Sequence, residues 1–378
     1  MSVWGVEACA SEDIYAWDKV EGATTFTRVT LTDHNSGKQQ WKHQLHRKMW
    51  DALDKIKPQV VVVPGWSFTD ALSALLWCAE TNTPTVVMSE SMAGDESRVA
   101  WKEWIKRRLV KLNSAGLVGG KLHCDYLIQL GLVRERIFLG YDVVDNEHFH
   151  RKADEARHRD AEVRSRLRLP TQYFLASARF VEKKNLFHLI QAYGRYRTLV
   201  KCSGTGNSKI WSLVLLGDGP IKSAIQKLIS ELGLESSVYL PGFKQYDELP
   251  AYFGLAEAFV HASTTEQWGL VVNEAMAASL PVLVSNRCGC GAELVLPGVN
   301  GFQFDPGNVD ELAHLFLKMS AENFPLADFG IASQRAVSNW GPERFANGLH
   351  DAIAMVLKNP QPRAGVFDRF LLRLLLRR

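Results

Sequence analysis

The chain has 378 residues, of which 46% are apolar and 22% are charged, and its length is typical of two domains. This apolar share excludes a disordered chain and a small scaffold held together by disulfides. The formal net charge of +3 gives no overall reason to expect a nucleic-acid-binding protein.

The six cysteines form no regular framework and indicate reduced thiols in a cytoplasmic protein. Cys288 and Cys290 are the one close pair, and no second Cys or His pair at ligand spacing accompanies them, so we expect no metal site. The N-terminal residues lack a signal-peptide pattern, and no run reaches the roughly 18 apolar residues of a membrane span.

Strands and helices alternate along the first 150 residues, which is typical of a parallel α/β sheet. Short apolar, β-branched runs predict the strands, and apolar residues at helical spacing predict the helices between them. The predicted strands are 3–7, 59–64, 83–88, 117–119 and 137–140, and the predicted helices are 69–80 and 123–130.

A polar, charge-dense stretch then predicts a linker over 151–170, and the alternation starts again over 171–339. The predicted strands of this second half are 173–178, 212–216, 238–240, 258–261 and 281–285. The predicted helices are 186–196, 221–232, 247–255 and 274–280, followed by a long helix over 340–357 and a basic amphipathic tail over 358–378.

Two carboxylates eight positions apart, Glu266 and Glu274, flank a Trp-Gly-Leu turn, the first after a predicted strand and the second opening a predicted helix. Ionised carboxylates are strong acceptors for sugar hydroxyls, so this pair suits a polyhydroxylated ligand. The alternative is structural: Glu274 complements a helix dipole and Glu266 lies on a solvated loop.

Other strand ends carry charges or glycines. Arg179 and Lys184 follow the strand at 173–178 and are suited to a phosphate or diphosphate, and Gly217 ends the strand at 212–216. Glycine lets a ligand approach the backbone closely. Because open α/β sheets bind ligands at the carboxyl ends of their strands, we expect these turns to form one site.

Residues 172–353 resemble the nucleotide-binding half of the group 1 glycosyltransferases, also called glycosyltransferase family 4. The resemblance rests on collinear motifs in this sequence: ARFVEKKNLFHLI, VLLGDGP, LPGFKQYDELPAYFGLAEAFVHAS, EQWGLVVNEAMAASLPVLVS and GAELVLPGVNGFQF. It implies the GT-B fold, with two Rossmann-like domains facing a cleft, a final helix that crosses back to the first domain, and a retaining reaction.

The resemblance also implies residue roles. Glu274 would bind the ribose hydroxyls and Glu266 the transferred sugar, while Arg179 and Lys184 would offset the charge that grows on the departing diphosphate. Backbone amides would contact sugar and phosphate at Gly269, Leu270 and Val271, and the base would lie at Gly242 and Phe243. No Asp-x-Asp pair occurs, so the resemblance implies no metal and no cofactor, only a UDP-, GDP- or ADP-sugar donor.

The first half departs from the family pattern in two ways. Where many members have a histidine after the strand at 83–88, this chain has Ser89-Glu90-Ser91, and Glu90 either contacts the acceptor or caps the next helix. The family also begins with a strand, a glycine-containing loop and a helix, whereas this chain is expected to begin at the next strand.

Trp66, after a strand end, is a candidate for stacking on an acceptor sugar, although most tryptophans belong to cores.

Two basic segments leave alternatives open. Residues 98–121 hold seven Lys or Arg with Trp101 and Trp104 between them, which fits either an anionic membrane surface or a solvated helix with core tryptophans. The tail, over 363–378, fits membrane contact or packing against the first domain. His261, near Glu266, is more typical of a buried, hydrogen-bonded histidine than of a catalytic one.

We therefore predict a metal-independent, cytoplasmic glycosyltransferase that moves a sugar from a nucleotide donor to a hydroxyl acceptor (a glycan, a lipid-linked molecule or a small molecule), with a role in polysaccharide biosynthesis. Possible partners are that acceptor and a membrane surface, and no nucleic acid is expected. The competing hypothesis is a nucleotide-sugar-binding protein without transfer activity, because its first strand–loop–helix unit is expected to be absent. An epimerase or phosphorylase on the same fold fits the Glu-x7-Glu spacing less well.

Overall fold

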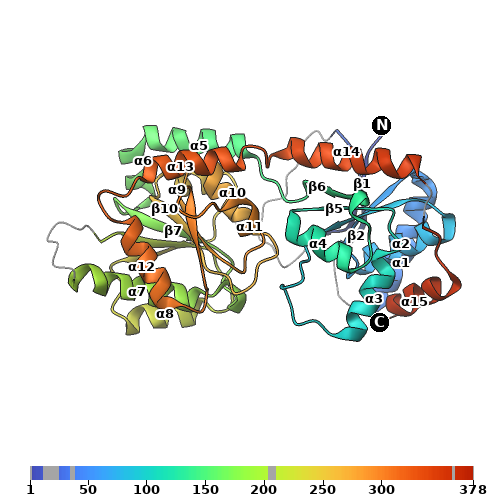
Figure 1. The fold of residues 1–378 in the computed structure, drawn as a ribbon, viewed down its shortest axis with the longest axis horizontal. Helices are drawn as coiled ribbons and strands as arrows, with labels where there is room; N and C mark the ends of the chain where they lie inside the picture. Colours follow the sequence, from blue (N-terminus) through green and yellow to red (C-terminus); the bar gives the residue numbers. More distant parts are fainter. Residues whose placement is uncertain (1, 12–24, 35–38, 203–209, 360–361, 378) are drawn as a thin grey trace.

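The computed structural model describes residues 2–11, 25–34, 39–202, 210–359 and 362–377, and it consists of two α/β domains side by side (Figure 1). The first domain has a four-stranded parallel sheet with its strands in chain order: β3 (Val61–Pro64), β4 (Thr85–Ser89), β5 (Ala115–Val118) and β6 (Ile137–Leu139). β1 (Trp4–Ser11) and β2 (Thr27–His34) form a separate parallel pair. The residues between β1 and β2 lie outside the described ranges for the most part, and the expected absence of a first unit stays a prediction.

The second domain has a six-stranded parallel sheet in the order β12-β11-β10-β7-β8-β9. Its strands are β7 (Tyr173–Ser177), β8 (Ser212–Leu216), β9 (Val238–Gly242), β10 (Ala258–His261), β11 (Val282–Ser285) and β12 (Gly301–Phe304). The strand order reverses between β7 and β10, and ligands of open α/β sheets bind outside the strand ends at such a point.

Helices join and cover the strands (Figure 1). In the first domain these are α1 (Gln39–Ile56), α2 (Thr69–Thr81), α3 (Ala100–Val110) and α4 (Lys121–Gln129). In the second they are α7 (Leu186–Cys202), α8 (Lys222–Glu231), α9 (Leu249–Gly254), α10 (Leu270–Ala277), α11 (Gly291–Leu294), α12 (Val309–Met319) and α13 (Leu326–Val337). Among the described residues, every helix is too short or too polar to pass through a bilayer.

The stretch predicted as a linker is helical for most of its length. α5 (Asn146–His158) and α6 (Asp160–Leu167) occupy it, and α5 packs against α9 and α10 of the second domain. The reason is a sparse apolar stripe within the charged sequence: Phe149, Ala153 and Ala156 lie on one face of α5 and are buried in the core of that domain. The charged residues between them form the solvated face.

Two apolar layers enclose the second sheet. One joins strand residues to α5, α9, α10 and α13, and the other joins them to α7, α8 and α12. The four inner strands β7, β8, β10 and β11 are almost fully buried on both faces, as their continuous apolar runs predict, whereas the edge strands β9 and β12 are partly exposed. This rigid sheet fixes where its strand ends, and the loops that follow them, lie.

The last two helices return to the first domain, as the resemblance implies. α14 (Pro342–Lys358) crosses the top of the first sheet, where Ala352 and Val356 pack on β4 and β5, and α15 (Val366–Leu376) packs against α2 (Figure 1). Gly348 permits the close approach of α14, because a Cβ there would lie 2.2 Å from the carbonyl oxygen of Leu139 on β6.

This contact predicts that Gly348→Ala destabilises the protein although alanine favours helices. The added methyl group meets backbone that has no room to shift, so we expect a loss of about 1–3 kcal/mol in the free energy of unfolding. Gly194→Ala in α7 is the matched control, because its Cβ would find only ordinary contacts beyond 3.5 Å. We expect that control to gain about 0.5–1 kcal/mol. Urea unfolding followed by circular dichroism measures both, and a Gly348→Ala variant at least as stable as Gly194→Ala would contradict the packing.

Candidate active site

The site lies where β7 and β10 end, at the point where the strand order of the second sheet reverses. A short 3-10 turn over Glu182–Lys184 follows β7, and the loop that carries Glu266 follows β10. Asn185, in a left-handed backbone conformation, ties this turn to the loops after β10 and β12 by donating hydrogen bonds to the carbonyl oxygens of Ala262 (3.1 Å) and Pro306 (2.8 Å), respectively. The turn therefore directs Lys184 at Glu266, and the two side chains form an ion pair.

Glu266 is held in its ionised form. Its Oε2 atom also accepts a hydrogen bond from Ser263 (3.2 Å) and contacts His261 Nε2 at 3.3 Å. Burial works against the charge, but His261 and Lys184 outweigh it and hold the pKa of Glu266 well below its usual range. Its carboxylate is therefore an acceptor at neutral pH, and no proton needs to leave it before it binds a hydroxyl.

His261 is buried and hydrogen-bonded, in agreement with the sequence-based interpretation. Burial lowers its pKa, but hydrogen bonds with Cys288 and Glu266 outweigh this effect and raise it. Its ring is 3% exposed, so it contacts Glu266 rather than solvent. We therefore regard His261 as a residue that positions Glu266.

The backbone of the Glu266 loop is held by hydrogen bonds to the backbone of the loop after β11. Glu266 and Cys288 form an isolated parallel β-bridge, and the amide of Gly289 donates a hydrogen bond to the carbonyl oxygen of Glu266 at 3.0 Å. A Cβ at Gly289 would lie 1.9 Å from the carbonyl oxygen of Gln267, so the approach requires glycine. Cys288 and Cys290 thus act as buried packing and hydrogen-bonding groups. Among the described residues, no group of three or more His, Cys, Asp or Glu side chains is placed to hold a metal ion.

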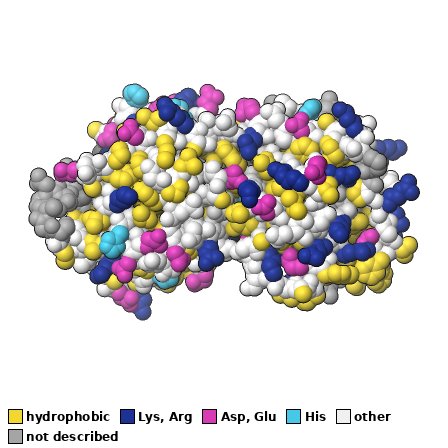
Figure 2. All heavy atoms as spheres, in the orientation of Figure 1, with side chains coloured by type: hydrophobic (Ala, Val, Ile, Leu, Met, Phe, Trp, Pro, Cys, Tyr) yellow, Lys and Arg dark blue, Asp and Glu magenta, His cyan; other side chains and the backbone are white. Residues whose placement is uncertain are grey.

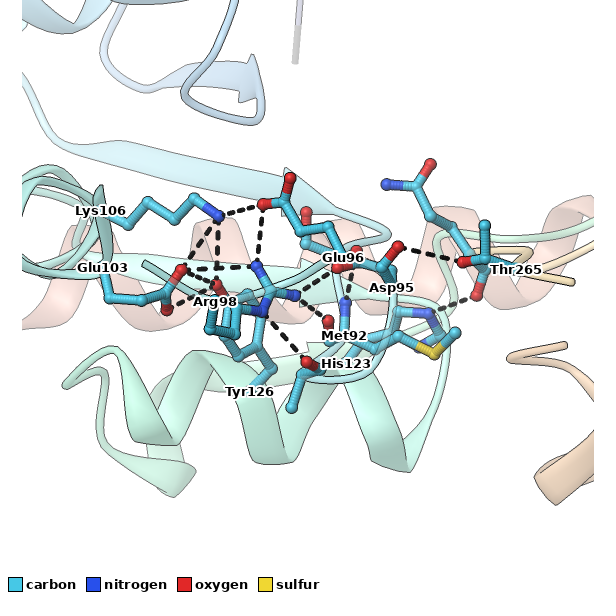
Figure 3. A network of polar contacts seen from close by, with 12 residues as sticks. Met92, Asp95, Glu96, Arg98, Glu103, Lys106, His123, Tyr126 and Thr265 are labelled. Carbon is cyan, nitrogen blue, oxygen red and sulfur yellow. Dashed lines mark hydrogen bonds and ion pairs between the residues drawn. The ribbon is translucent and has the colours of Figure 1, made fainter. Parts of the chain in front are cut away.

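The residues on either side of Glu266 are hydrogen-bonded to the first domain (Figure 3). Thr265 Oγ1 donates to the carbonyl oxygen of Asp95 at 3.1 Å, and Gln267 O accepts from His123 Nε2 at 2.8 Å. The amide of Gly120 donates to His123 Nδ1 at 3.2 Å, so the proton of this ring is on Nε2. Glu266 is therefore fixed at the junction of the two domains.

The first domain places two carboxyl groups at this junction. Glu90 follows β4 and lies near Asp142, Glu266 and Lys183. Glu266 raises the pKa of Glu90, whereas Asp142 and Lys183 lower it. Burial and the neighbouring Glu90 raise the pKa of Asp142 to about 9, and burial raises that of Glu90. The pair therefore keeps a proton at neutral pH. Glu90 does not cap α3, which begins ten residues later at Ala100 with Val99 at its N-cap.

Glu274 lies in the second turn of α10 and does not open the helix, because α10 begins at Leu270. Gly269, with a φ of 97°, starts the helix four residues earlier than the sequence predicts. Burial raises the pKa of Glu274 to about 7. Tyr246, whose ring stacks on His148 with centroids 4.6 Å apart, lies close enough for Glu274 to raise its pKa.

The remaining predicted residues lie along the same edge of the sheet. Arg179 is exposed just after β7, and Gly217, after β8, has a Cβ position 1.9 Å from the carbonyl oxygen of Ala178, which only glycine tolerates. The other predicted positions are the half-exposed Phe243 after Gly242, which ends β9, and the start of α10 at Leu270 and Val271.

Trp66 does not belong to this site. Its ring is 7% exposed and packs in the core of the first domain with the helices α1 and α2, so it has no face to offer to a sugar. The prediction for Trp66 was wrong because a strand end can direct a side chain inward as well as outward. Conversely, Asp142, Lys183 and Thr265 belong to the junction although no motif singles them out. Asp142 lies in the segment FLGYDVVDNEHF just after β6, and no residue pattern in that segment predicts a role for its carboxyl.

Residues 159–335 match the model of the family Glycosyl transferases group 1. This part of the chain is similar to the group 1 glycosyltransferases. The group 1 segment contains Arg179, Lys184, Glu266 and Glu274, which are the residues brought to the edge of the second sheet. The recognition made from the sequence motifs is thereby confirmed.

Known proteins also resemble parts of this chain. It is 28% identical over 236 residues to the amylovoran biosynthesis glycosyltransferase AmsK of Erwinia amylovora, a match that covers 61% of this chain and 53% of AmsK. It is 34% identical over 107 residues to the alpha-monoglucosyldiacylglycerol synthase of Acholeplasma laidlawii, covering 28% of this chain and 25% of that protein. The chain thus spans about half, or less, of the length of these curated relatives.

The solved structure of Anabaena HepE in complex with UDP has the same fold, with a TM-score of 0.69 and 19% identity over 88% of this chain and 87% of HepE. The sucrose-phosphate synthase of Thermosynechococcus elongatus aligns with a TM-score of 0.73 and 16% identity, covering 94% of this chain and 88% of that one. The predicted fold class, two Rossmann-like domains in the GT-B arrangement, is confirmed.

The buried Glu274 carboxyl predicts a pH-dependent cost in stability. Because its pKa is raised from 4.5 to about 7, the cost is absent below pH 4.5, grows between the two values and is complete above pH 7. We expect Glu274→Gln to stabilise the protein by roughly 2 kcal/mol at pH 8 and by nothing measurable at pH 4.5. Thermal unfolding across this range measures the difference, and a gain that is independent of pH would contradict the assigned cause.

Proposed function

We propose that this protein is a retaining glycosyltransferase that moves a sugar from a nucleoside-diphosphate sugar to a hydroxyl acceptor. The observation that carries the proposal is the ion pair of Glu266 and Lys184 at the switch point of the second sheet, held against the carboxyl groups of the first domain. One domain offers cations and a fixed carboxylate for a donor, and the other offers polar groups for an acceptor.

The donor half of the proposal rests on the group 1 segment. Glu274 binds the two ribose hydroxyls through its carboxylate, and Phe243 lies beside the base. HepE was solved with UDP and with UDP-glucose, and a relative in Mycobacterium tuberculosis is named as a GDP-mannose-dependent mannosyltransferase. These names support a nucleotide-sugar donor and leave uridine and guanosine as the bases to test first.

Catalysis is electrostatic in this proposal. The bond from the anomeric carbon to the diphosphate breaks with its electron pair, and Arg179 and Lys184 stabilise the charge that grows on the departing diphosphate. Two side-chain cations do the work for which other transferases use a divalent metal. Glu266, kept ionised by His261, accepts hydrogen bonds from the sugar hydroxyls and orients the ring for attack by the acceptor oxygen.

The acceptor meets the first domain at Glu90. Because the pKa of Asp142 is raised to about 9, this carboxyl keeps its proton at neutral pH, and together with Glu90 it offers both a hydrogen-bond donor and an acceptor to a hydroxyl group. A pair of this kind can hold an acceptor oxygen near the anomeric carbon. As that oxygen bonds to the carbon, its proton passes to the departing diphosphate, which has taken the electron pair of the broken bond. The names of two relatives, an amylovoran biosynthesis glycosyltransferase and a monoglucosyldiacylglycerol synthase, support glycan and lipid acceptors as the classes to try.

A nucleotide-sugar-binding protein without transfer activity is the second hypothesis, and the site does not favour it. A binding protein needs Glu274 and the glycine turns, but it has no use for a cation paired with Glu266 at the junction of two domains. A thermal-shift screen with UDP, GDP, ADP and their sugars, followed by an assay for the released nucleotide, separates the two hypotheses. Stabilisation by a nucleotide sugar without any release of nucleotide would favour the binding protein.

The roles of Glu274 and Lys184 predict different kinetic defects. We expect Glu274→Ala to weaken donor binding by tenfold or more, because a carboxylate that accepts two hydroxyl hydrogen bonds is lost. We expect Lys184→Ala to reduce kcat by 100-fold or more with a smaller change in donor affinity, because its charge acts on the leaving group. Calorimetric titration with the nucleoside diphosphate and steady-state kinetics measure the two effects.

The exposed Lys227 on α8 is the matched control for Lys184, and Lys227→Ala should leave both quantities unchanged. Donor affinity in Glu274→Ala equal to that of the unaltered protein would count against the ribose assignment. Full turnover in Lys184→Ala would count against electrostatic catalysis by this cation.

The role of Glu90 predicts an effect on the acceptor alone. We expect Glu90→Gln to raise the KM for the acceptor by roughly tenfold, because one charged hydrogen bond is lost, while donor hydrolysis in the absence of acceptor stays the same. Glu182→Gln, an exposed carboxyl in the turn after β7, is the control. An equal loss of donor hydrolysis and transfer in Glu90→Gln would place this residue with the donor instead.

A further inference from the structure

Helices α3 and α15 carry large apolar side chains that point away from the core of the first domain. Phe370 is 60% exposed, Trp101 54%, and Trp104 and Phe367 each 49%. Leu374, which is 43% exposed, extends the same surface. We name this surface the α3–α15 face and define it by these five residues. Figure 2 shows an apolar patch with basic side chains beside it at the lower right of the molecule, where Figure 1 places α3 and α15.

The face is formed by side chains that contact one another although they come from two segments more than 250 residues apart in the sequence. The rings of Trp104 and Phe367 meet edge to face with centroids 5.9 Å apart. Arg108 of α3 lies over the Phe367 ring and pairs with Asp368 at 2.5 Å. The contact between the helices is therefore specific, and both present their apolar side chains on one side.

The opposite side of α15 anchors it to the first domain. Leu371 and Leu372 are buried, and Arg373 pairs with Glu80 at 2.7 Å while Arg369 donates to the carbonyl oxygen of Ala79. The expectation that the tail packs against the first domain is met by this side. The exposed side, with Phe370 and Leu374, is left for another partner.

The face is flanked by positive charge. The sequence of α3 has four basic residues against one acidic residue, and of these Lys102 and Arg107 are exposed. Lys102 lies 5.8 Å from the Trp101 ring. Lys106 and Arg98, in contrast, pair with Glu96 and Glu103 and hold the loop before α3 in place (Figure 3). The charge that remains at the surface is thus basic and lies beside the exposed rings.

We propose that the α3–α15 face docks on the surface of an anionic lipid bilayer. Contiguous exposed apolar side chains rimmed by charge mark interaction sites, and tryptophan beside lysine and arginine suits the headgroup region of a membrane. Anionic lipids supply the charge that complements Lys102 and Arg107, at about 1 kcal/mol for each basic side chain. The apolar rings enter the boundary of the acyl chains, and the helices lie in the plane of the surface.

The face is connected to the domain junction by one short loop. The ten residues from Glu90 to Val99 lead from the carboxyl pair to α3, and within them Asp95 accepts the hydrogen bond from Thr265 beside Glu266. A bilayer docked on this face is therefore connected to the carboxyl pair through this one ten-residue loop. This step rests on the proposed function, and it assigns the acceptor to molecules that carry a lipid, whereas the docking itself is independent of transfer.

Vesicle binding tests the docking. The whole protein is mixed with vesicles of phosphatidylcholine alone or with 30% phosphatidylglycerol, and flotation measures the bound fraction at low and high salt. We expect binding to the anionic vesicles only. Each of the charge reversals Lys102→Glu and Arg107→Glu should weaken it by more than about fivefold, because it removes one basic side chain and adds a negative charge. The double variant Trp101→Ser with Phe370→Ser is expected to lose roughly tenfold or more in its partition coefficient.

The control replaces two side chains of similar exposure outside the face, Ile331 and Leu357, with serine. It should bind as the unaltered protein does. Absence of binding to anionic vesicles, or equal losses in the control and the double variant, would overturn the proposal, as would sedimentation showing a dimer that the double variant dissolves. If the double variant unfolds, the charge reversals at exposed positions take its place. Nucleotide binding and release are measured on the same samples, so a failure of docking is distinguished from a failure of the proposed transfer.

Discussion

The ion pair of Lys184 and Glu266 is the interaction on which the proposed site depends. It joins the ends of β7 and β10 across the one place where the strand order of the second sheet reverses. His261 and Ser263 support the carboxylate from within, and the neighbours of Glu266 are hydrogen-bonded to the first domain. A single carboxylate is thus held by the sheet, by a buried histidine and by the junction of the domains, which pre-organises it for a ligand.

Several groups around this pair are held at a cost in stability. Glu274 is buried with its pKa raised to about 7, and Asp142 keeps its proton to about 9 because it is buried beside Glu90. Buried carboxyl groups of this kind do not strengthen a fold. In the proposed function, hydroxyl groups of the ligands donate hydrogen bonds to these carboxyls and offset that cost.

The local patterns predicted much of the fold, since the apolar runs of β7, β8, β10 and β11 and the helical spacing of α7 are properties of neighbouring residues. These local patterns could not predict contacts between segments that are distant in the sequence. The buried stripe of α5 was hidden in a charged stretch. Whether Trp101 and Trp104 lie in a core or on the surface stayed open, because residue type does not reveal which side of a helix is covered. Asp142 was not predicted as a site residue, because it comes close to Glu90 only in the folded chain.

A crystal structure of the complex with the nucleoside diphosphate that stabilises the protein most would test the central claim directly. Our account predicts the ribose hydroxyls within hydrogen-bond distance of the Glu274 carboxylate, and the diphosphate between Arg179 and Lys184 at the ends of β7 and β8. It also predicts that Glu266 faces the position of the missing sugar. A nucleotide bound elsewhere, or a diphosphate that does not contact Lys184, would contradict it.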